Sequence, residues 1–330
     1  MNVNFSKKTI GTTFIVLFII FYSIGVYWSF EPEELDIKQL VTEAAKQNNV
    51  TPVIGFTTTT TLILVSESLL QKPGGYLAND ALPPSGFLDN IPAWEYGVLE
   101  MVRDMALVMR REFSRSQSQS IENEYLKEAQ PKFNFDHTSW AMPNSEGEYQ
   151  NAIDQLYLYR DSLTRSGNQS AQFYARADNL RAWLLEATKR LGSYSQRLSA
   201  SVGREQLNVE LAGDSAAKQS SQSSSLLALK TSWWQLDNEF YESRGACWAL
   251  LHFLRAIEID FNDVLEKKNA KVSVQQIIRE LEASQQSIWS PMILNGDGFG
   301  LLANHSLVMA NYISRANAAL IDLNDLLSQG

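Results

Sequence analysis

The hydrophobic and polar positions divide the chain into one long apolar run and a series of amphipathic segments. Residues 9–30 form 22 consecutive positions without a charged side chain. As a helix, at about 1.5 Å per residue, this run is roughly 33 Å long, enough to cross a bilayer. Lysines precede it, at Lys7 and Lys8, and glutamates follow it. This asymmetry predicts that residues 1–8 are cytoplasmic, that residues 9–30 span the membrane, and that the remainder lies outside.

A cleaved signal peptide is the competing interpretation of the same run. Ser23 and Gly25 form a small-x-small site, but the apolar run is longer than a typical signal core and continues past that site. The pattern therefore favours an uncleaved anchor. Residues 31–48 then predict a short juxtamembrane helix, with Pro32 suited to its first turn.

Beyond residue 49, most segments show helical spacing. Residues 56–71 combine threonines, which favour strand, with leucines and an abrupt Lys-Pro-Gly-Gly end, and we expect a helix. Apolar residues repeat at helical spacing from Trp94 to Phe113. The sequence Ser-Glu-Gly-Glu at Ser145 has the form of a capping box and predicts the start of the next helix.

Two heptad-patterned stretches predict long helices in the middle of the chain. The first runs from Phe173 to Leu198 and the second from Leu236 to Val264, with apolar residues at alternating steps of three and four. Residues 170–204 hold six basic and two acidic residues, a net +4, and residues 233–268 hold four basic and seven acidic residues, a net −3. These opposite charges predict that the two helices can face each other.

The segment near 203–230 is rich in serine and glutamine, and we expect a mobile linker there. Two more amphipathic segments follow, at 272–289 and 301–329. Few residues alternate with a period of two, so any sheet would be small. The predicted fold class is all-α: an N-terminal transmembrane helix followed by a periplasmic helical bundle over residues 49–330 with long heptad-patterned helices.

Composition and charge narrow the function. The chain has 330 residues, 45% of them hydrophobic, which is enough for a sizeable core. Its formal net charge of −9 argues against a nucleic-acid partner, because phosphate recognition needs a clustered positive field. A single cysteine, Cys247, excludes an intrachain disulfide framework, and its place on the second heptad stretch predicts a buried spacer.

The candidate metal motifs are weak. Residues 295–300, Asn-Gly-Asp-Gly-Phe-Gly, resemble the opening of a calcium loop, but Phe299 and Ser306 stand where ligands are needed, so a tight turn is expected. His137, His252 and His305 lack metal-ligand spacing, and a helix-face histidine with a local hydrogen bond is the simpler interpretation. We expect no metal and no cofactor.

Catalytic candidates are also sparse. Glu100 and Asp104 lie four residues apart and could pair an acid with a base, although a solvated helix face is the commoner reason for such spacing. Glu67 and Glu242, each followed by serine, resemble the Glu-Ser pair of lytic transglycosylases, whose other motifs are missing. An enzyme is therefore the less favoured class, and no catalytic residue is assigned.

Residues 72–94 form a proline- and glycine-rich segment with large apolar side chains. Such a composition predicts an ordered loop rather than a flexible linker. It would serve either as a cap over one end of the bundle or as a rigid recognition rim. The partner-binding candidates in it are Tyr76, Phe87, Ile91 and Trp94.

Five sequence segments resemble those of a known protein family. They are residues 72–104, 113–120, 172–184, 190–203 and 277–330. They resemble an uncharacterised family of Gram-negative bacterial envelope proteins, catalogued as a domain of unknown function. The resemblance covers nearly the whole chain after the anchor. It implies a bacterial inner-membrane setting and supplies no catalytic or binding residues.

The predicted function is a single-pass inner-membrane protein whose periplasmic helical domain makes protein contacts in the cell envelope, as scaffold, assembly factor or sensor. Its expected partners are the lipid bilayer, through residues 9–30, and either another envelope protein or a second copy of the chain. Two alternatives stay open: a cell-wall-active enzyme of lytic-transglycosylase-like type, and a periplasmic ligand-binding module.

Overall fold

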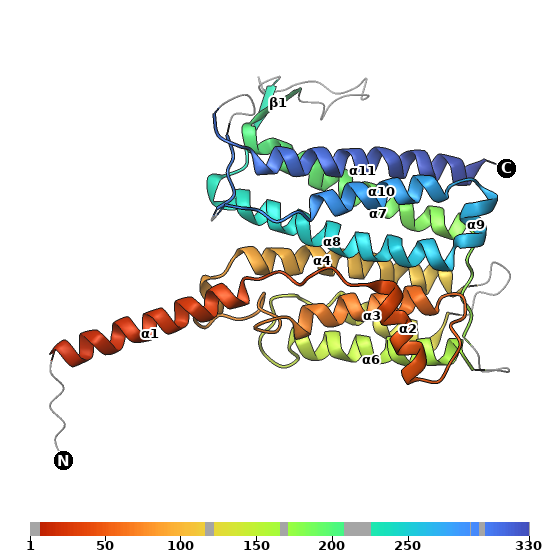
Figure 1. Ribbon diagram of the computed structural model, residues 1–330, viewed down its shortest axis with the longest axis horizontal. Helices are drawn as coiled ribbons and strands as arrows, with labels where there is room; N and C mark the ends of the chain where they lie inside the picture. Colours follow the sequence, from red (N-terminus) through yellow and green to blue (C-terminus); the bar gives the residue numbers. More distant parts are fainter. Residues whose placement is uncertain are drawn as a thin grey trace, which may run out of the picture.

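The computed structural model describes residues 7–115, 122–165, 171–207, 226–290, 292–296 and 301–329. Long helices lie side by side along one axis, and the first helix projects from one end of them (Figure 1). The helices are α1 Lys7–Trp28, α2 Ile37–Gln47, α3 Phe56–Gln71, η1 Ser85–Phe87, α4 Asn90–Val108, η2 Met109–Phe113, α5 Glu124–Phe133, α6 Ser145–Leu163, α7 Ala177–Ser199, η3 Ala200–Val202, η4 Trp233–Gln235, α8 Leu236–Asp260, α9 Asn262–Lys267, α10 Lys271–Ser284 and α11 His305–Ser328. The predicted all-α class is confirmed.

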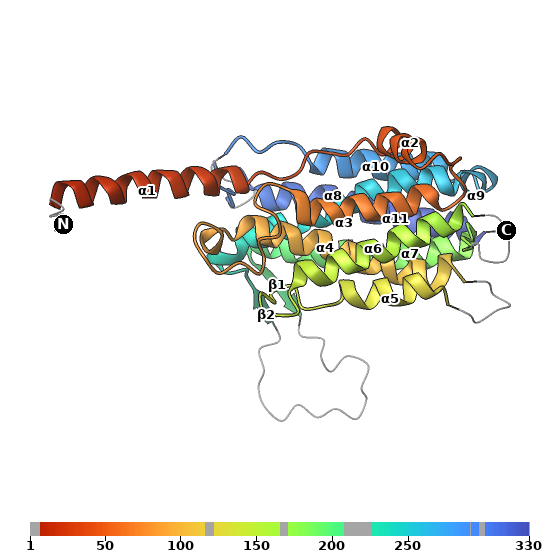
Figure 2. The same ribbon diagram turned by 90° about the horizontal axis from the view of Figure 1, so that it is seen from below.

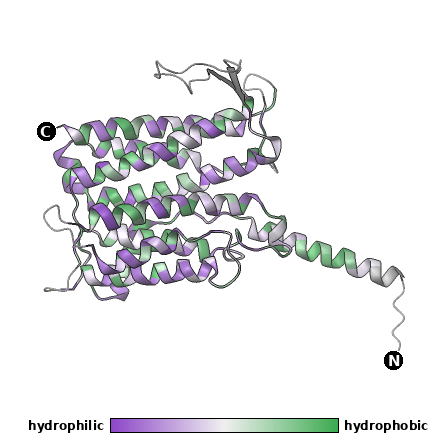
Figure 3. Cartoon of the chain, turned by 180° about the vertical axis from the view of Figure 1, so that it is seen from behind, coloured by the Kyte–Doolittle hydropathy of each residue, from purple (hydrophilic) through white to green (hydrophobic). Residues whose placement is uncertain are grey.

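Helix α1 is apolar along most of its length beyond Lys8, whereas hydrophobic and hydrophilic residues are mixed along the bundle helices (Figure 3). Its residues Gly11–Trp28 are long and apolar enough to cross a membrane, and almost none of that stretch is buried in the protein. The helix ends before Phe30, and residues 30–36 are extended. Pro32 therefore lies in this extended segment and not, as predicted, in the first turn of the next helix, because α2 begins only at Ile37 behind an Asp36 cap.

The threonine-rich segment, which was ambiguous between strand and helix, forms helix α3, as expected. Its threonines are buried. The hydroxyl groups of Thr59 and Thr61 donate to backbone carbonyls one turn earlier, to Gly55 at 2.7 Å and to Thr57 at 2.9 Å, and the Thr58 hydroxyl donates to Asp260 at 2.7 Å. This local bonding satisfies polar groups that would otherwise be costly to bury. Helix α6 begins at Ser145 as predicted, but Asn144 supplies the cap by accepting from the Gly147 amide at 3.3 Å. The Ser145 hydroxyl instead donates to the Asp136 carbonyl at 2.7 Å.

The bundle has two parts, which Figure 1 shows one above the other. Helices α3 and α5 pack beside α4, with α6 packed on α3 and α5, and helices α7, α10 and α11 pack beside α8. The pairing of α4 with α8 joins the two parts and is the most extensive helix contact of the bundle. Trp94 of α4 and Trp248 of α8 lie at its centre, with ring centroids 5.2 Å apart, and both are buried.

The heptad stretches are buried as predicted, but they do not mainly face each other. Helix α7 packs chiefly on α11, and helix α8 packs chiefly on α4. The expected charge pairing is present at one end, where Arg197 of α7 pairs with Glu239 at 2.8 Å and with Glu242 at 2.6 Å, both on α8. The periodicity of apolar residues identified the buried face of each helix. It did not identify which helix packs on that face, because this depends on how the side chains of two helices fit together.

Two short strands, β1 Arg204–Leu207 and β2 Leu226–Leu229, pair antiparallel. They form a small sheet, in agreement with the sequence. The linker expected near 203–230 falls mostly on residues 208–225, which lie outside the described residues.

Candidate functional site

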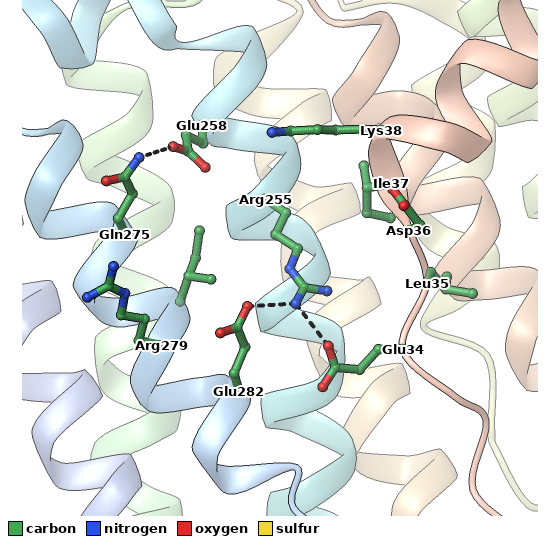
Figure 4. Close-up of a pocket in the computed structure, with 11 residues that line it drawn as sticks. Glu34, Leu35, Asp36, Ile37, Lys38, Arg255, Glu258, Gln275, Arg279 and Glu282 are labelled. Carbon is green, nitrogen blue, oxygen red and sulfur yellow. Dashed lines mark hydrogen bonds and ion pairs between the residues drawn. The ribbon is translucent and has the colours of Figure 1, made fainter.

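A polar groove lies between residues 34–38, which lead into α2, and helices α8 and α10. Its cavity volume is about 620 Å³. Arg255 of α8 stands at its centre and donates to Glu34 at 2.9 Å and to Glu282 of α10 at 2.8 Å (Figure 4). Beside it, Gln275 donates to Glu258 at 2.7 Å. We call this cavity the polar groove.

The charges of the polar groove are partly paired. Burial alone would lower the pKa of Arg255, but its hydrogen bonds to Glu282 and Glu34 outweigh burial and raise that pKa. Arg255 is therefore a fixed cation that holds residues 34–38 against the bundle. Lys38 and Arg279 also line the groove, are exposed, and have no ion-pair partner among the residues that the structure describes. These two cations are the groups free to meet a ligand.

Residues 31–37 form one wall of the polar groove because contacts with the bundle hold them at several points. Pro32 disfavours helix for Glu31 and keeps the segment extended. Glu31 then accepts from Arg244 of α8 at 2.7 Å, and the Leu35 amide donates to Nε2 of His252 at 2.8 Å. The groove wall is thus a built part of the bundle.

His252 is buried and uses both ring nitrogens. Its Nδ1 lies 2.6 Å from the Trp248 carbonyl, one turn back on α8, and its Nε2 accepts from Leu35. Nδ1 therefore carries the proton. Burial lowers the pKa of His252 to about 4, so the ring is neutral at physiological pH. The local hydrogen bond predicted from the sequence is present, and the bond to Leu35 is an addition that the sequence did not indicate.

Three of the four partner-binding candidates lie in the core. Tyr76, Ile91 and Trp94 are buried, whereas 81% of Phe87 is exposed. Tyr76 donates its hydroxyl to the His137 carbonyl at 3.1 Å. Of these four side chains only Phe87 is accessible to another molecule, and the other three pack against the helices.

A buried ion pair explains why this loop is ordered. The Lys72 ammonium lies 2.5 Å from the Glu95 carboxylate, and both side chains are wholly buried. Glu95 also accepts from the backbone amides of Leu77 and Ala78, at 2.9 and 2.8 Å. Burial raises the pKa of Glu95 to about 7, although Lys72 and the two amides act in the opposite direction. Sequence reasoning missed this pair, because neither residue has a distinctive neighbourhood in the sequence.

The paired carboxylates of α4 do not form a solvated face. Glu100 is buried and pairs with Arg103 at 3.1 Å and with Arg190 of α7. Asp104 accepts from the same Arg190 at 2.7 Å. Four charged groups thus join α4 to α7. Because Arg190 lies so close to both carboxylates, Glu100 and Asp104 cannot act independently as an acid and a base.

The two glutamates that resemble the Glu-Ser pair of lytic transglycosylases make other contacts. Glu67 accepts from the Tyr157 hydroxyl at 2.7 Å, and Glu242 pairs with Arg197. Neither lines the polar groove.

The described residues give little support for a metal site or a reactive thiol. Within the described ranges, no three His, Cys, Asp or Glu side chains gather as a metal site. Asn295 pairs with Asn304 across the turn at the start of α11, and residues 297–300 of the calcium-like motif lie outside those ranges. Cys247 is wholly buried, and burial raises its pKa to about 12, so the thiol stays protonated and inaccessible.

Comparison with protein families matches residues 2–330 to the family DUF2333, described as "Uncharacterized protein conserved in bacteria". No curated protein and no solved structure matches the chain. The match spans α1 together with the whole bundle.

Proposed function

Because the chain belongs to the bacterial family DUF2333, we propose that it is a single-pass inner-membrane protein whose periplasmic helical domain makes protein contacts in the cell envelope. The observation that carries the proposal is α1, an apolar helix left uncovered by the bundle and long enough to cross a bilayer. Lys7 and Lys8 at its start support a cytoplasmic N-terminus.

The polar groove is the surface that we assign to a protein partner. It lies on a helical face away from α1, and its wall is held rigid by Arg255, which lowers the entropic cost of binding. Lys38 and Arg279 present two cations that acidic side chains of an extended segment could pair with. The partner is therefore expected to offer a charged polypeptide segment rather than an apolar helix.

In vivo photo-crosslinking tests this function. A photoreactive amino acid is placed at Lys38 in one strain and at Arg279 in another, with Lys189, an exposed residue of α7, as the matched control. We expect one discrete adduct from the two groove positions that is absent from the Lys189 strain. Mass spectrometry should identify an envelope protein with a periplasmic portion. Charge reversal by Arg279→Glu should reduce the Lys38 adduct severalfold.

Two results would contradict the proposal. Adducts with cytoplasmic proteins would place the domain on the wrong side of the membrane. The same adducts from Lys189 as from Lys38 would show that the polar groove has no selective partner.

A further inference from the structure

Exposed aromatic side chains collect at one end of the bundle. The chain has eight tryptophans. Trp94, Trp183 and Trp248 are buried, and Trp28 is partly buried at the end of α1. The other four are strongly exposed and lie in connecting segments: Trp140, Trp233, Trp234 and Trp289.

These connecting segments lie at the end from which α1 leaves (Figures 1 and 2). The 72–89 loop touches α1 directly, since the Trp28 ring covers Gly74. The loop with Trp140 is bonded to the same place, because Asn79 donates to the Ser139 carbonyl at 2.9 Å. Trp233 and Trp234 immediately precede α8, and Trp289 follows α10, whose end is held by Arg244 of α8.

The 72–89 loop also runs beside the apolar part of α1. A methyl group added at Gly25 would lie 3.6 Å from Pro84 and 3.8 Å from Leu88, so the loop is level with the last apolar turn of the helix. Between them is a second cavity of about 1110 Å³, lined on α1 by Phe14, Phe18 and Phe21 and on the loop by Pro84 and Phe87. We call this cavity the apolar groove.

The position of the apolar groove identifies its occupant. It continues along α1 to Phe14, eleven residues and about 16 Å before Gly25. If α1 spans the bilayer, the groove opens at the depth of the acyl chains, where water is excluded. Tryptophan is enriched where such chains meet the headgroups, because its ring is apolar and its N–H is polar. A lipid acyl chain therefore fits the groove, and the lipid interface fits the exposed tryptophans.

We propose that this end of the bundle is a lipid-contact surface, in which Phe87, Trp233, Trp234 and Trp289 enter the interface of the bilayer and the apolar groove holds acyl chain. The inference rests on the proposed function, because it needs α1 to span that bilayer. It assigns Phe87 to lipid rather than to a protein partner.

Spin-label accessibility on the full chain tests this surface. Phe87→Cys and Trp289→Cys variants are labelled with a nitroxide in vesicles of phosphatidylethanolamine and phosphatidylglycerol. Ile19→Cys in α1, an exposed site that does not line the apolar groove, is the membrane control, and Val272→Cys, an exposed site at the other end of α10, is the aqueous control. Cys247 is buried and serves as the unlabelled background. Because lipid excludes a nickel chelate and concentrates oxygen, the ratio of oxygen to nickel accessibility reports depth.

We expect the ratio at Phe87 and Trp289 to be several times that at Val272 and to approach that at Ile19. If the ratio at Ile19 is that of lipid while the ratios at Phe87 and Trp289 equal that at Val272, the lipid-contact surface is overturned and the anchor stands. If the ratio at Ile19 is itself that of water, the proposed anchor fails and this inference fails with it.

Discussion

At the scale of single residues, His252 connects the core of the bundle to the segment that follows α1. One ring nitrogen bonds within α8 and the other accepts from Leu35. The acceptor role requires a neutral ring, and burial keeps the ring neutral by lowering its pKa to about 4. Protonation would remove that acceptor and place a charge in the core.

This arrangement predicts an acid-sensitive stability. The usual histidine pKa is 6.5, so the unfolded chain binds the proton first as pH falls. His252 therefore contributes fully to the free energy of unfolding above pH 6.5, and this contribution is lost as pH falls toward 4. Between pH 7 and pH 5 the loss is about 2 kcal/mol. His252→Gln keeps a donor and an acceptor without titrating. We expect the difference in unfolding free energy between wild type and variant to shrink by that amount over this range.

The measurement is denaturant unfolding of the full chain in detergent micelles at several pH values. The variant is needed because Glu95 titrates in the opposite sense, its pKa being raised to about 7 by burial. Glu95 favours folding below pH 4.5 and loses that contribution as pH rises through 7. A difference that stays constant from pH 7 to pH 5 would show that His252 does not titrate as described.

At the scale of helices, two glycines allow α4 and α8 to pack closely. A methyl group at Gly97 of α4 would overlap the Glu242 carbonyl, and one at Gly245 of α8 would overlap the Trp94 carbonyl. Both obstacles are backbone atoms, which cannot rotate away. The most extensive helix contact of the bundle therefore depends on the absence of two side chains.

Gly97→Ala is expected to destabilise the protein by about 3 kcal/mol or more, because the two helices must separate and the tryptophan contact between them is lost. The control is Gly192→Ala on α7, where an added methyl group would lie 3.7 Å from the Asn317 side chain, an ordinary contact. That change should be neutral or stabilise by about 0.5–1 kcal/mol through helix propensity. Thermal unfolding of both variants compares the two, and equal melting temperatures would contradict the close packing.

These glycines also show which features of the fold could be predicted from the sequence and which could not. Periodicity was sufficient to place the long helices and their buried faces, since Leu184 and Leu250 are buried as their heptad positions indicate. It could not predict that α8 faces α4, because Gly97 and Gly245 carry no apolar signal. Likewise the composition of the proline-rich loop predicts order, but it does not indicate the Lys72–Glu95 pair that fastens the loop to α4, because these residues come together only after folding.

At the scale of the whole molecule, Arg244 couples α1 to the bundle. Its guanidinium donates to Glu31 at 2.7 Å and to the carbonyls of Ser284, Gln285 and Gln286 at 3.0 Å, at the end of α10. Arg244 is buried, so these charge-assisted bonds are little screened by solvent. Arg244 thus holds the chain just after α1 against the bundle, and the packing of Trp28 on Gly74 holds the end of the helix itself.

Glu31→Gln is expected to loosen the direction in which α1 leaves the bundle without unfolding the bundle, because the three carbonyl bonds of Arg244 remain. Distances between nitroxide labels at Phe18 and Lys189, measured by double electron–electron resonance in lipid, should broaden in the variant. Glu33→Gln, two residues further on at an exposed side chain, is the matched control and should leave the distribution unchanged. Identical distributions for both variants would show that Glu31 does not set the orientation.

The direction of α11 has a practical consequence. This helix starts at the end from which α1 leaves and finishes at the opposite end of the bundle (Figure 1). Its 24 residues cover about 36 Å. In the proposed orientation, a fluorescent protein or an affinity tag fused after Ser328 would stand about that far above the bilayer, toward the cell wall, where it can report on the protein without crowding the lipid.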